Sequence, residues 1–130
     1  MVRLGKIGLF PGFGAAWLYP RAMGVAKALE LLFTGDLLEA EEAKEIGMVN
    51  KLASTEELEG VTMSLARKIA DGPPIAIRLM KAQVYKGLGL DLATALDEAA
   101  FCESITLASK DHLEGITAFR EKRKPSFEGN

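Results

Sequence analysis

The stretch Ile7-Gly8-Leu9-Phe10-Pro11-Gly12-Phe13-Gly14 says most about the fold of this chain. Its first four residues are mostly apolar and end at a Pro-Gly pair, the pattern of a short strand that turns into a loop. The next residues, Ala15 to Arg21, are expected to form a short helix whose regularity Pro20 limits. The sequence therefore predicts a strand, a glycine-containing loop and a helix in close succession.

Outward from this stretch, apolar residues recur at spacings of three and four, which is typical of helices. Start signals are clearest at Ser54, which forms a capping box with Glu57, and at Asp91 and Ser109, which can cap the last two helices. Met48 to Leu52 alternates instead and predicts a second short strand. Because two isolated strands make a poor sheet, the rest of the sheet is expected upstream of these residues or in another chain.

Composition excludes several classes of function. The 130 residues are 48% hydrophobic and 26% charged, the balance of a globular protein. The 16 Lys+Arg against 18 Asp+Glu give a net charge of −2, which does not fit a nucleic-acid-binding domain. The apolar runs are too short for a membrane span, and no signal peptide is visible. The low cysteine content makes a reducing, cytoplasmic location the default expectation. The single cysteine, Cys102, excludes an internal disulfide and a cysteine-based zinc cluster.

Local features offer few candidates for chemistry. The loop Gly12-Phe13-Gly14 begins like a dinucleotide fingerprint, but Trp17 stands in the place of the third glycine. Its glycines can serve a structural turn, or they can let the backbone approach a ligand near a helix N-terminus. His112, the only histidine, is expected to be solvated and to bind no metal. Cys102 is expected to be a buried structural thiol.

The C-terminal run Arg120, Lys122, Arg123 and Lys124 is a local excess of positive charge. It can be the solvated end of a helix, since cations suit a helix C-terminus. It can also clamp phosphate groups, which Lys and Arg bind in compact anion sites. These residues by themselves leave both interpretations open.

Three blocks of the sequence match one known pattern in order and spacing. Residues 7–14, with Pro20-Arg21 and Gly24, match G-L-x-P-G-x-G…L-P-R-x-x-G. Residues 26–35, 40–43 and 47–51 match K-A-x-E-L-x-x-T-G…A-E-E-A…G-L-V-N-x-V. Residues 114–127 match E-G-x-x-A-F-x-E-K-R-K-P-x-F. Together the blocks resemble the crotonase family, the enoyl-CoA hydratase/isomerase group, over nearly the whole chain.

The resemblance implies an α/β crotonase-like fold of which this chain is the C-terminal half, mainly α-helical with one or two short strands. Residues 1–24 would form the last part of a β-β-α spiral with an acyl-pocket loop and helix. Residues 25–130 would form the helical C-terminal trimerisation region. Family members are about twice this long and form trimers or dimers of trimers, so a homo-oligomer is expected.

The resemblance also implies a chemistry, in which an acyl-CoA thioester is held in an oxyanion hole that stabilises an enolate. Both oxyanion donors and the first hydratase glutamate would lie upstream of these residues. The second glutamate position is Leu4, whose alkyl side chain cannot transfer a proton. No catalytic residue or metal ligand is therefore assigned, and no cofactor is expected except coenzyme A as part of the substrate. These residues alone are expected to be inactive.

Two binding features carry over by position. Pro11, Gly12, Phe13, Gly14 and Trp17 would line the acyl pocket, where Phe13 and Trp17 would shape substrate choice. Lys122, the lysine of E-K-R, matches a family position that reaches the phosphates of coenzyme A, which favours the phosphate-clamp interpretation of the tail. Glu103 stands where some members place an aromatic residue, so adenine stacking is not predicted there.

Two alternatives to an acyl-CoA enzyme fit these features to different degrees. A non-catalytic truncated paralogue, or an assembly module with residual coenzyme A binding, fits Leu4 and the missing oxyanion hole. A small helical DNA-binding domain fits the helices but not the acidic balance of charge.

Overall fold

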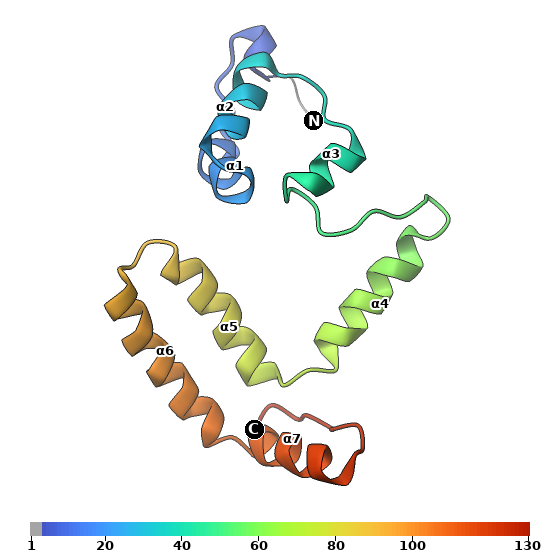
Figure 1. The fold of residues 1–130 in the computed structure, drawn as a ribbon, viewed down its shortest axis with the longest axis vertical. Helices are drawn as coiled ribbons and strands as arrows, with labels where there is room; N and C mark the ends of the chain where they lie inside the picture. The colour runs from blue at the N-terminus through green and yellow to red at the C-terminus, as the bar shows by residue number, and fades with distance from the viewer. Residues whose placement is uncertain (1–3) are drawn as a thin grey trace. The chain divides into compact units, whose positions relative to one another are not determined.

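The computed structural model describes residues 4–130, and the regular structure within that range is helical. The chain forms two compact units, Met1–Leu58 and Glu59–Asn130. The first contains the 3-10 helix η1 (Leu4–Ile7) and the helices α1 (Ala15–Met23), α2 (Val25–Thr34) and α3 (Ala40–Glu45) (Figure 1). Helix α4 (Leu58–Ala70) begins at the boundary, and α5 (Pro74–Gly87), α6 (Leu92–Leu107) and α7 (Lys110–Glu121) follow in the second unit.

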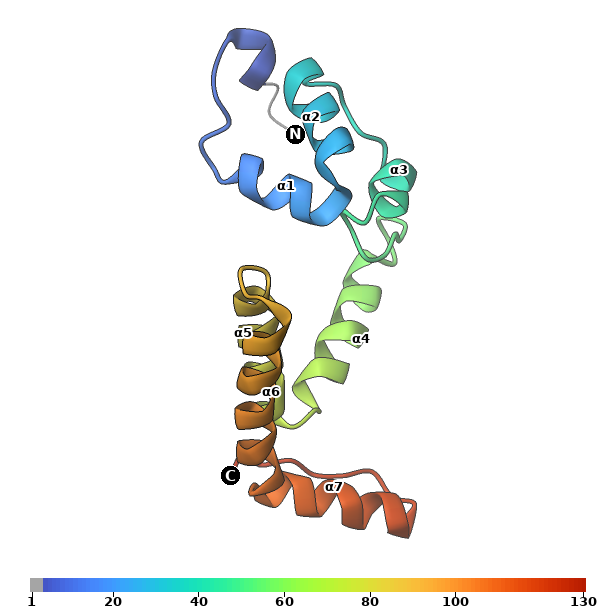
Figure 2. The ribbon, with the colours of Figure 1, turned by 60° about the vertical axis from the view of Figure 1, so that its left-hand side comes forward.

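In the first unit, α1 and α2 contact each other and meet at a corner, joined by a single residue, Gly24 (Figures 1 and 2). Gly24 has φ 79°, a left-handed conformation that glycine adopts without steric cost. This glycine lets the chain reverse between the two helices. Ala28 and Leu31 of α2 are buried, so the turn places a small apolar core on α2.

An ion-pair cluster links α2 to α3. Lys27 Nζ lies 2.7 Å from the Glu30 carboxylate on its own helix and 2.6 Å from the Glu42 carboxylate on α3. The hydrogen bonds to Glu30 and Glu42 raise the pKa of Lys27 to about 12. Lys27 therefore stays charged at neutral pH and fixes α3 beside α2.

The structure corrects the two predicted strands. Ile7 ends η1 and the residues up to Phe10 are irregular, while 48–52 contain only bends and irregular chain. A strand is stable only when its backbone N–H and C=O groups are paired. No partner strand occurs among residues 4–130, so these segments do not form a sheet there.

The second unit is built on α5 and α6, which run antiparallel and side by side (Figures 1 and 2). Lys86 of α5 and Glu98 of α6 form an ion pair of 2.7 Å across the two helices. The predicted cap of α6 is confirmed, because Asp91 Oδ1 accepts from the Thr94 backbone N–H at 3.0 Å. The predicted cap of α7 is also confirmed: Ser109 Oγ accepts from the His112 backbone N–H at 3.1 Å.

The predicted capping box at Ser54 is met only in part. Ser54 Oγ accepts from the Glu57 backbone N–H at 3.2 Å and donates to the Glu57 carboxylate at 3.1 Å. A box would instead have Glu57 accept from the Ser54 backbone N–H. The residues between them form a turn, and α4 begins only at Leu58.

The chain after α7 folds back along that helix as a C-terminal tail of residues 122–130 (Figure 1). Asp111, which is buried, accepts from the backbone N–H groups of Glu128 at 2.8 Å and Gly129 at 3.0 Å. The Phe127 ring lies against Gly115, 3.6 Å from where a Cβ would sit. The tail is thus an ordered part of the second unit.

Many large apolar side chains stay exposed in both units. The buried apolar residues of the described chain are all small except one: Ala28, Leu31, Ala43 and Ala118. On α6, Phe101 is 65% exposed. Apolar faces of this kind normally contact another protein surface.

No described helix is long and apolar enough to cross a membrane. The predicted domain boundary after residue 24 stays a prediction.

Candidate functional site

The predicted acyl-pocket loop leads directly into α1 of the first unit. Gly14 ends the loop at φ 79°, and its carbonyl accepts from the backbone N–H groups of Trp17 at 3.0 Å and Leu18 at 2.9 Å. Gly14 therefore has a structural task, because its left-handed conformation starts the helix. Gly12 differs, since a Cβ at that position would meet nothing within 4 Å. Pro11 is half-buried beside it.

The two aromatic residues of this loop and helix are open to a ligand. Phe13 is 90% exposed and Trp17 is 46% exposed. Exposed rings of this size are available for apolar contacts. Pro11 to Trp17 thus form one continuous segment, the end of the loop and the start of α1.

Arg21 contacts Trp17, an interaction that the sequence analysis missed. The guanidinium carbon lies 3.8 Å from the centroid of the indole, and Nη1 donates to the Trp17 carbonyl at 2.9 Å. The signal was present, because residues four apart on a helix are neighbours and arginine stacks on tryptophan.

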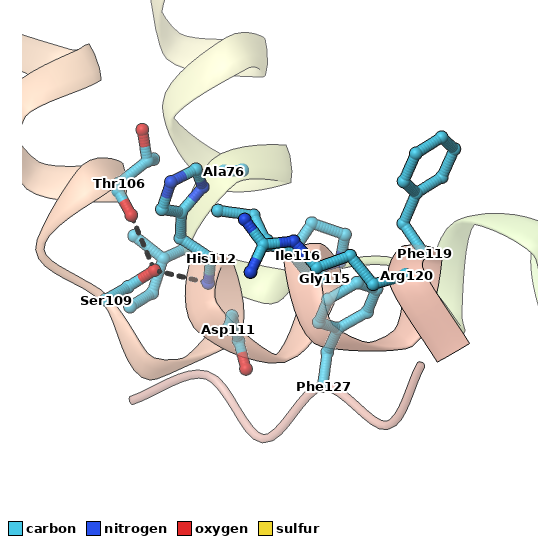
Figure 3. Close-up of a pocket in the computed structure, with 12 residues that line it drawn as sticks. Ala76, Thr106, Ser109, Asp111, His112, Gly115, Ile116, Phe119, Arg120 and Phe127 are labelled. Carbon is cyan, nitrogen blue, oxygen red and sulfur yellow. Dashed lines mark hydrogen bonds between the residues drawn. The ribbon is translucent and has the colours of Figure 1, made fainter. Parts of the chain in front are cut away.

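A cavity of about 520 Å³ opens in the second unit where α7 meets the ends of α5 and α6 (Figure 3). Its wall contains these residues: Pro73, Ile75, Ala76, Thr106, Ser109, Asp111, His112, Gly115, Ile116, Phe119, Arg120 and Phe127. His112 is half-buried there, which corrects the expectation of a solvated histidine. The imidazole lies beside Ala76 of α5 in the wall of the cavity (Figure 3).

The polar groups of this cavity do not form a nucleophilic site. Ser109 Oγ donates to the Thr106 carbonyl at 2.7 Å and accepts from the His112 backbone N–H, as the dashed lines in Figure 3 show. The hydroxyl is therefore used in the helix cap and makes no hydrogen bond to the imidazole of His112. The Asp111 carboxylate is occupied by the tail. Among the residues described, no cluster of His, Cys, Asp and Glu could hold a metal ion.

The basic run divides into paired and unpaired cations. Arg123 donates from Nη1 and Nη2 to the Glu114 carboxylate at 2.5 and 2.8 Å and from Nε to Glu121 at 2.6 Å. Lys124 Nζ lies 2.5 Å from Asp71 Oδ2. The Arg123 guanidinium and the Ser126 N–H lower the pKa of Glu114 to about 2. The side chains of Arg123 and Lys124 are thus engaged in ion pairs that hold the C-terminal tail.

Lys122, like Arg120, is left without an ion pair among residues 4–130. It follows α7 directly, is exposed, and has φ 55°, a left-handed conformation that is rare outside glycine. Its backbone N–H donates to the Phe119 carbonyl at 3.3 Å, so the backbone is fixed while the ammonium is free. Leu4 begins η1, but the prediction for its side chain falls outside the described side chains.

Comparisons with known proteins find close similarity. A family profile described as "Enoyl-CoA hydratase/isomerase" matches residues 2–130. The mouse protein named "Enoyl-CoA hydratase domain-containing protein 2, mitochondrial" is 40% identical over 126 residues, which cover 94% of this chain and 43% of that protein. The "Crotonyl-CoA hydratase" of Syntrophomonas wolfei is 39% identical over 121 residues, covering 93% of this chain and 46% of that protein.

Solved structures agree with the sequence comparison. The crystal structure of enoyl-CoA hydratase from Bacillus anthracis matches with a TM-score of 0.93 and 38% identity, covering 96% of this chain and 48% of that one. The chain thus spans a little under half the length of the relatives and the structure it matches here.

Proposed function

The chain belongs to the enoyl-CoA hydratase/isomerase family, and we propose that it is the C-terminal half of a protein that acts on acyl-CoA thioesters. In this proposal the oxyanion hole that stabilises the enolate is supplied by segments that these 130 residues do not contain. The described residues would supply part of the acyl pocket and a contact to coenzyme A. No cofactor is proposed except coenzyme A as part of the substrate.

The acyl-pocket part of the proposal rests on the segment from Pro11 to Trp17. The exposed rings of Phe13 and Trp17 offer apolar surface on a helix start that Gly14 holds in place. The open space at Gly12 leaves room for a ligand to approach the backbone. We propose that this segment lines the acyl chain near its reacting carbons.

The observation that carries the proposal for the tail is the free ammonium group of Lys122. Its neighbours Arg123 and Lys124 are committed to carboxylates, whereas Lys122 is exposed on a fixed backbone. An unpaired cation can bind a phosphate without first breaking an internal ion pair. Lys122 and Arg120 are thus the exposed cations of this run without an ion pair among the described residues, and Lys122 is proposed for the phosphates of coenzyme A because it also matches the family position that reaches them.

Isothermal titration of the purified chain with coenzyme A tests this assignment. Lys122→Ala should weaken binding by roughly three- to tenfold, the effect of losing one exposed charge-assisted contact. Lys81→Ala on α5 is the matched control, because Lys81 is also exposed and has no ion pair among the described residues. Equal affinities of the two variants would dismiss the role of Lys122.

Activity is tested separately. Because these residues hold neither oxyanion donors nor an assigned acid, the purified chain should not hydrate crotonyl-CoA, followed as loss of the conjugated thioester absorbance. Measurable hydration would overturn this expectation. A chain that binds coenzyme A but does not hydrate crotonyl-CoA would agree with two forms of the proposal. In one the chain is a portion of an enzyme, and in the other it is a non-catalytic assembly module.

We also propose that the chain assembles with copies of itself, as a trimer or a dimer of trimers, in the cytoplasm. The exposed apolar residues of α5 and α6, among them Met80, Val84 and Phe101, support an assembly surface in the second unit. The same faces favour the assembly-module alternative as much as the enzymatic one.

A further inference from the structure

Arg21 and Trp17 form a two-point contact on one side of α1. The guanidinium stacks over the indole at 3.8 Å, and its Nη1 donates to the Trp17 carbonyl at 2.9 Å. The stack restricts the rotation of the ring, and the hydrogen bond anchors the guanidinium to the backbone of the same residue. Together they hold the indole in one orientation relative to its own helix.

The sequence around this pair makes the contact possible. A carbonyl oxygen has two lone pairs, so that of Trp17 can accept from the guanidinium besides a backbone donor. The four-residue spacing then puts the guanidinium over the ring.

Trp17 is only partly covered by the described residues. The side chain is nearly half exposed, at 46%, and Phe13 in the preceding loop is more exposed still. An exposed ring without a fixed neighbour samples several rotamers. A pocket wall that samples several rotamers cannot measure the length of an acyl chain.

We propose that Arg21 is a positioning residue that locks the Trp17 indole and thereby sets the acyl-chain length that the pocket accepts. The effect on acyl-chain length rests on the proposed function, whereas the locked orientation of the ring does not depend on it. The class of ligand is an acyl-CoA thioester, and the ring defines one wall of its apolar site.

The locked ring is tested by fluorescence, because Trp17 is the only tryptophan of the chain. Arg21→Ala should shift the emission to longer wavelength and raise the acrylamide quenching constant about twofold, since the indole loses its cover. Arg21→Lys should restore part of the effect, because an ammonium can cover the ring but lacks the planar fork. Arg67→Ala on α4, an exposed arginine elsewhere, is the control and should change nothing.

The chain-length effect is tested by binding butyryl-CoA and octanoyl-CoA to the same variants. Arg21→Ala should change the ratio of the two dissociation constants by about threefold or more, and free coenzyme A should bind as before. Far-UV circular dichroism with an unchanged melting temperature shows that the variant keeps its helices.

The outcomes separate the two proposals. Unchanged Trp17 emission and quenching in Arg21→Ala overturns the positioning role, whatever binds. A changed emission with an unchanged butyryl-to-octanoyl ratio overturns the effect on chain length. A chain that binds no acyl-CoA at all contradicts the proposed function, while the fluorescence still decides whether Arg21 locks the ring.

Discussion

Arg123 and Glu114 form a two-pronged ion pair, in which Nη1 and Nη2 of the guanidinium donate to the two carboxylate oxygens at 2.5 and 2.8 Å. The same carboxylate accepts from the Ser126 N–H at 2.9 Å. Glu114 thus joins α7 to both ends of the sharp turn at the start of the C-terminal tail. The pair gives the tail an electrostatic anchor that depends on pH.

The first prediction concerns that dependence. The pKa of Glu114 is lowered from 4.5 to about 2, so its ionised form is favoured in the folded chain. A lowered carboxylate pKa contributes stability above the unfolded value that is lost as pH falls through the folded value. The anchor should therefore be complete above pH 4.5 and weaken between 4.5 and about 2. The Ser126 amide resonance should titrate with a midpoint near the lower value.

A matched variant checks the cause of this titration. Glu114→Gln keeps an acceptor oxygen but removes the charge, so the Ser126 amide should no longer titrate in this range. A midpoint near 4.5 in the parent chain would contradict the ion pair as the cause.

The second prediction concerns the other end of the tail. Asp111→Ala leaves the N–H groups of Glu128 and Gly129 without their acceptor, and should cost about 1–3 kcal/mol and release the tail. Hydrogen exchange at these two amides should become fast in the variant. Asp111→Asn keeps one acceptor oxygen and should lie between the parent chain and the alanine variant. Protected amides in Asp111→Ala would show that the tail is held by other contacts.

The third prediction concerns the start of α7. Ser109→Ala removes the acceptor of the His112 N–H and should lower the free energy of unfolding by about 1 kcal/mol. Ser109→Thr keeps a capping hydroxyl and serves as the control. Urea unfolding followed by helical circular dichroism measures both. Equal midpoints for the two variants would mean that the cap does not stabilise this helix.

The fourth prediction concerns self-association. If the open face of α6 contacts another copy, Phe101→Ser should lower the mass measured by light scattering, because a 65% exposed ring becomes polar. Phe13→Ser, a like change in the acyl-pocket loop, should leave the mass as it was. A parent chain that stays monomeric at high concentration would speak against the assembly.

Local signals predicted the helices well. The caps at Asp91 and Ser109 depend on residues within three positions, so the sequence contains all that is needed to place them. Three motif blocks in register predicted the crotonase-like fold class, which the likeness to solved enoyl-CoA hydratases confirms. The strands were predicted from a short apolar run and from alternation, and such patterns form strands only where partners exist.

Contacts between distant residues could not be predicted in the same way. Asp111 looks like an acid that favours the N-terminus of a helix, but its partners lie 17 and 18 positions later, on a tail with no local pattern. The free state of Lys122 follows from the pairing of Arg123 and Lys124 with Glu114 and Asp71, which composition does not specify. The stack of Arg21 on Trp17 was within reach, because spacing and residue type both indicate it.

The conformation of Lys122 implies a trade-off between folding and ligand capture at one position. A left-handed residue at the end of a helix is usually glycine, and a residue with a Cβ costs about 1 kcal/mol more there. Lys122→Gly should thus raise the melting temperature while it weakens coenzyme A binding, whereas Lys122→Ala keeps the strain and loses only the charge. A stabilised chain that binds poorly would mean that this helix end is suited to its ligand at the expense of its own stability.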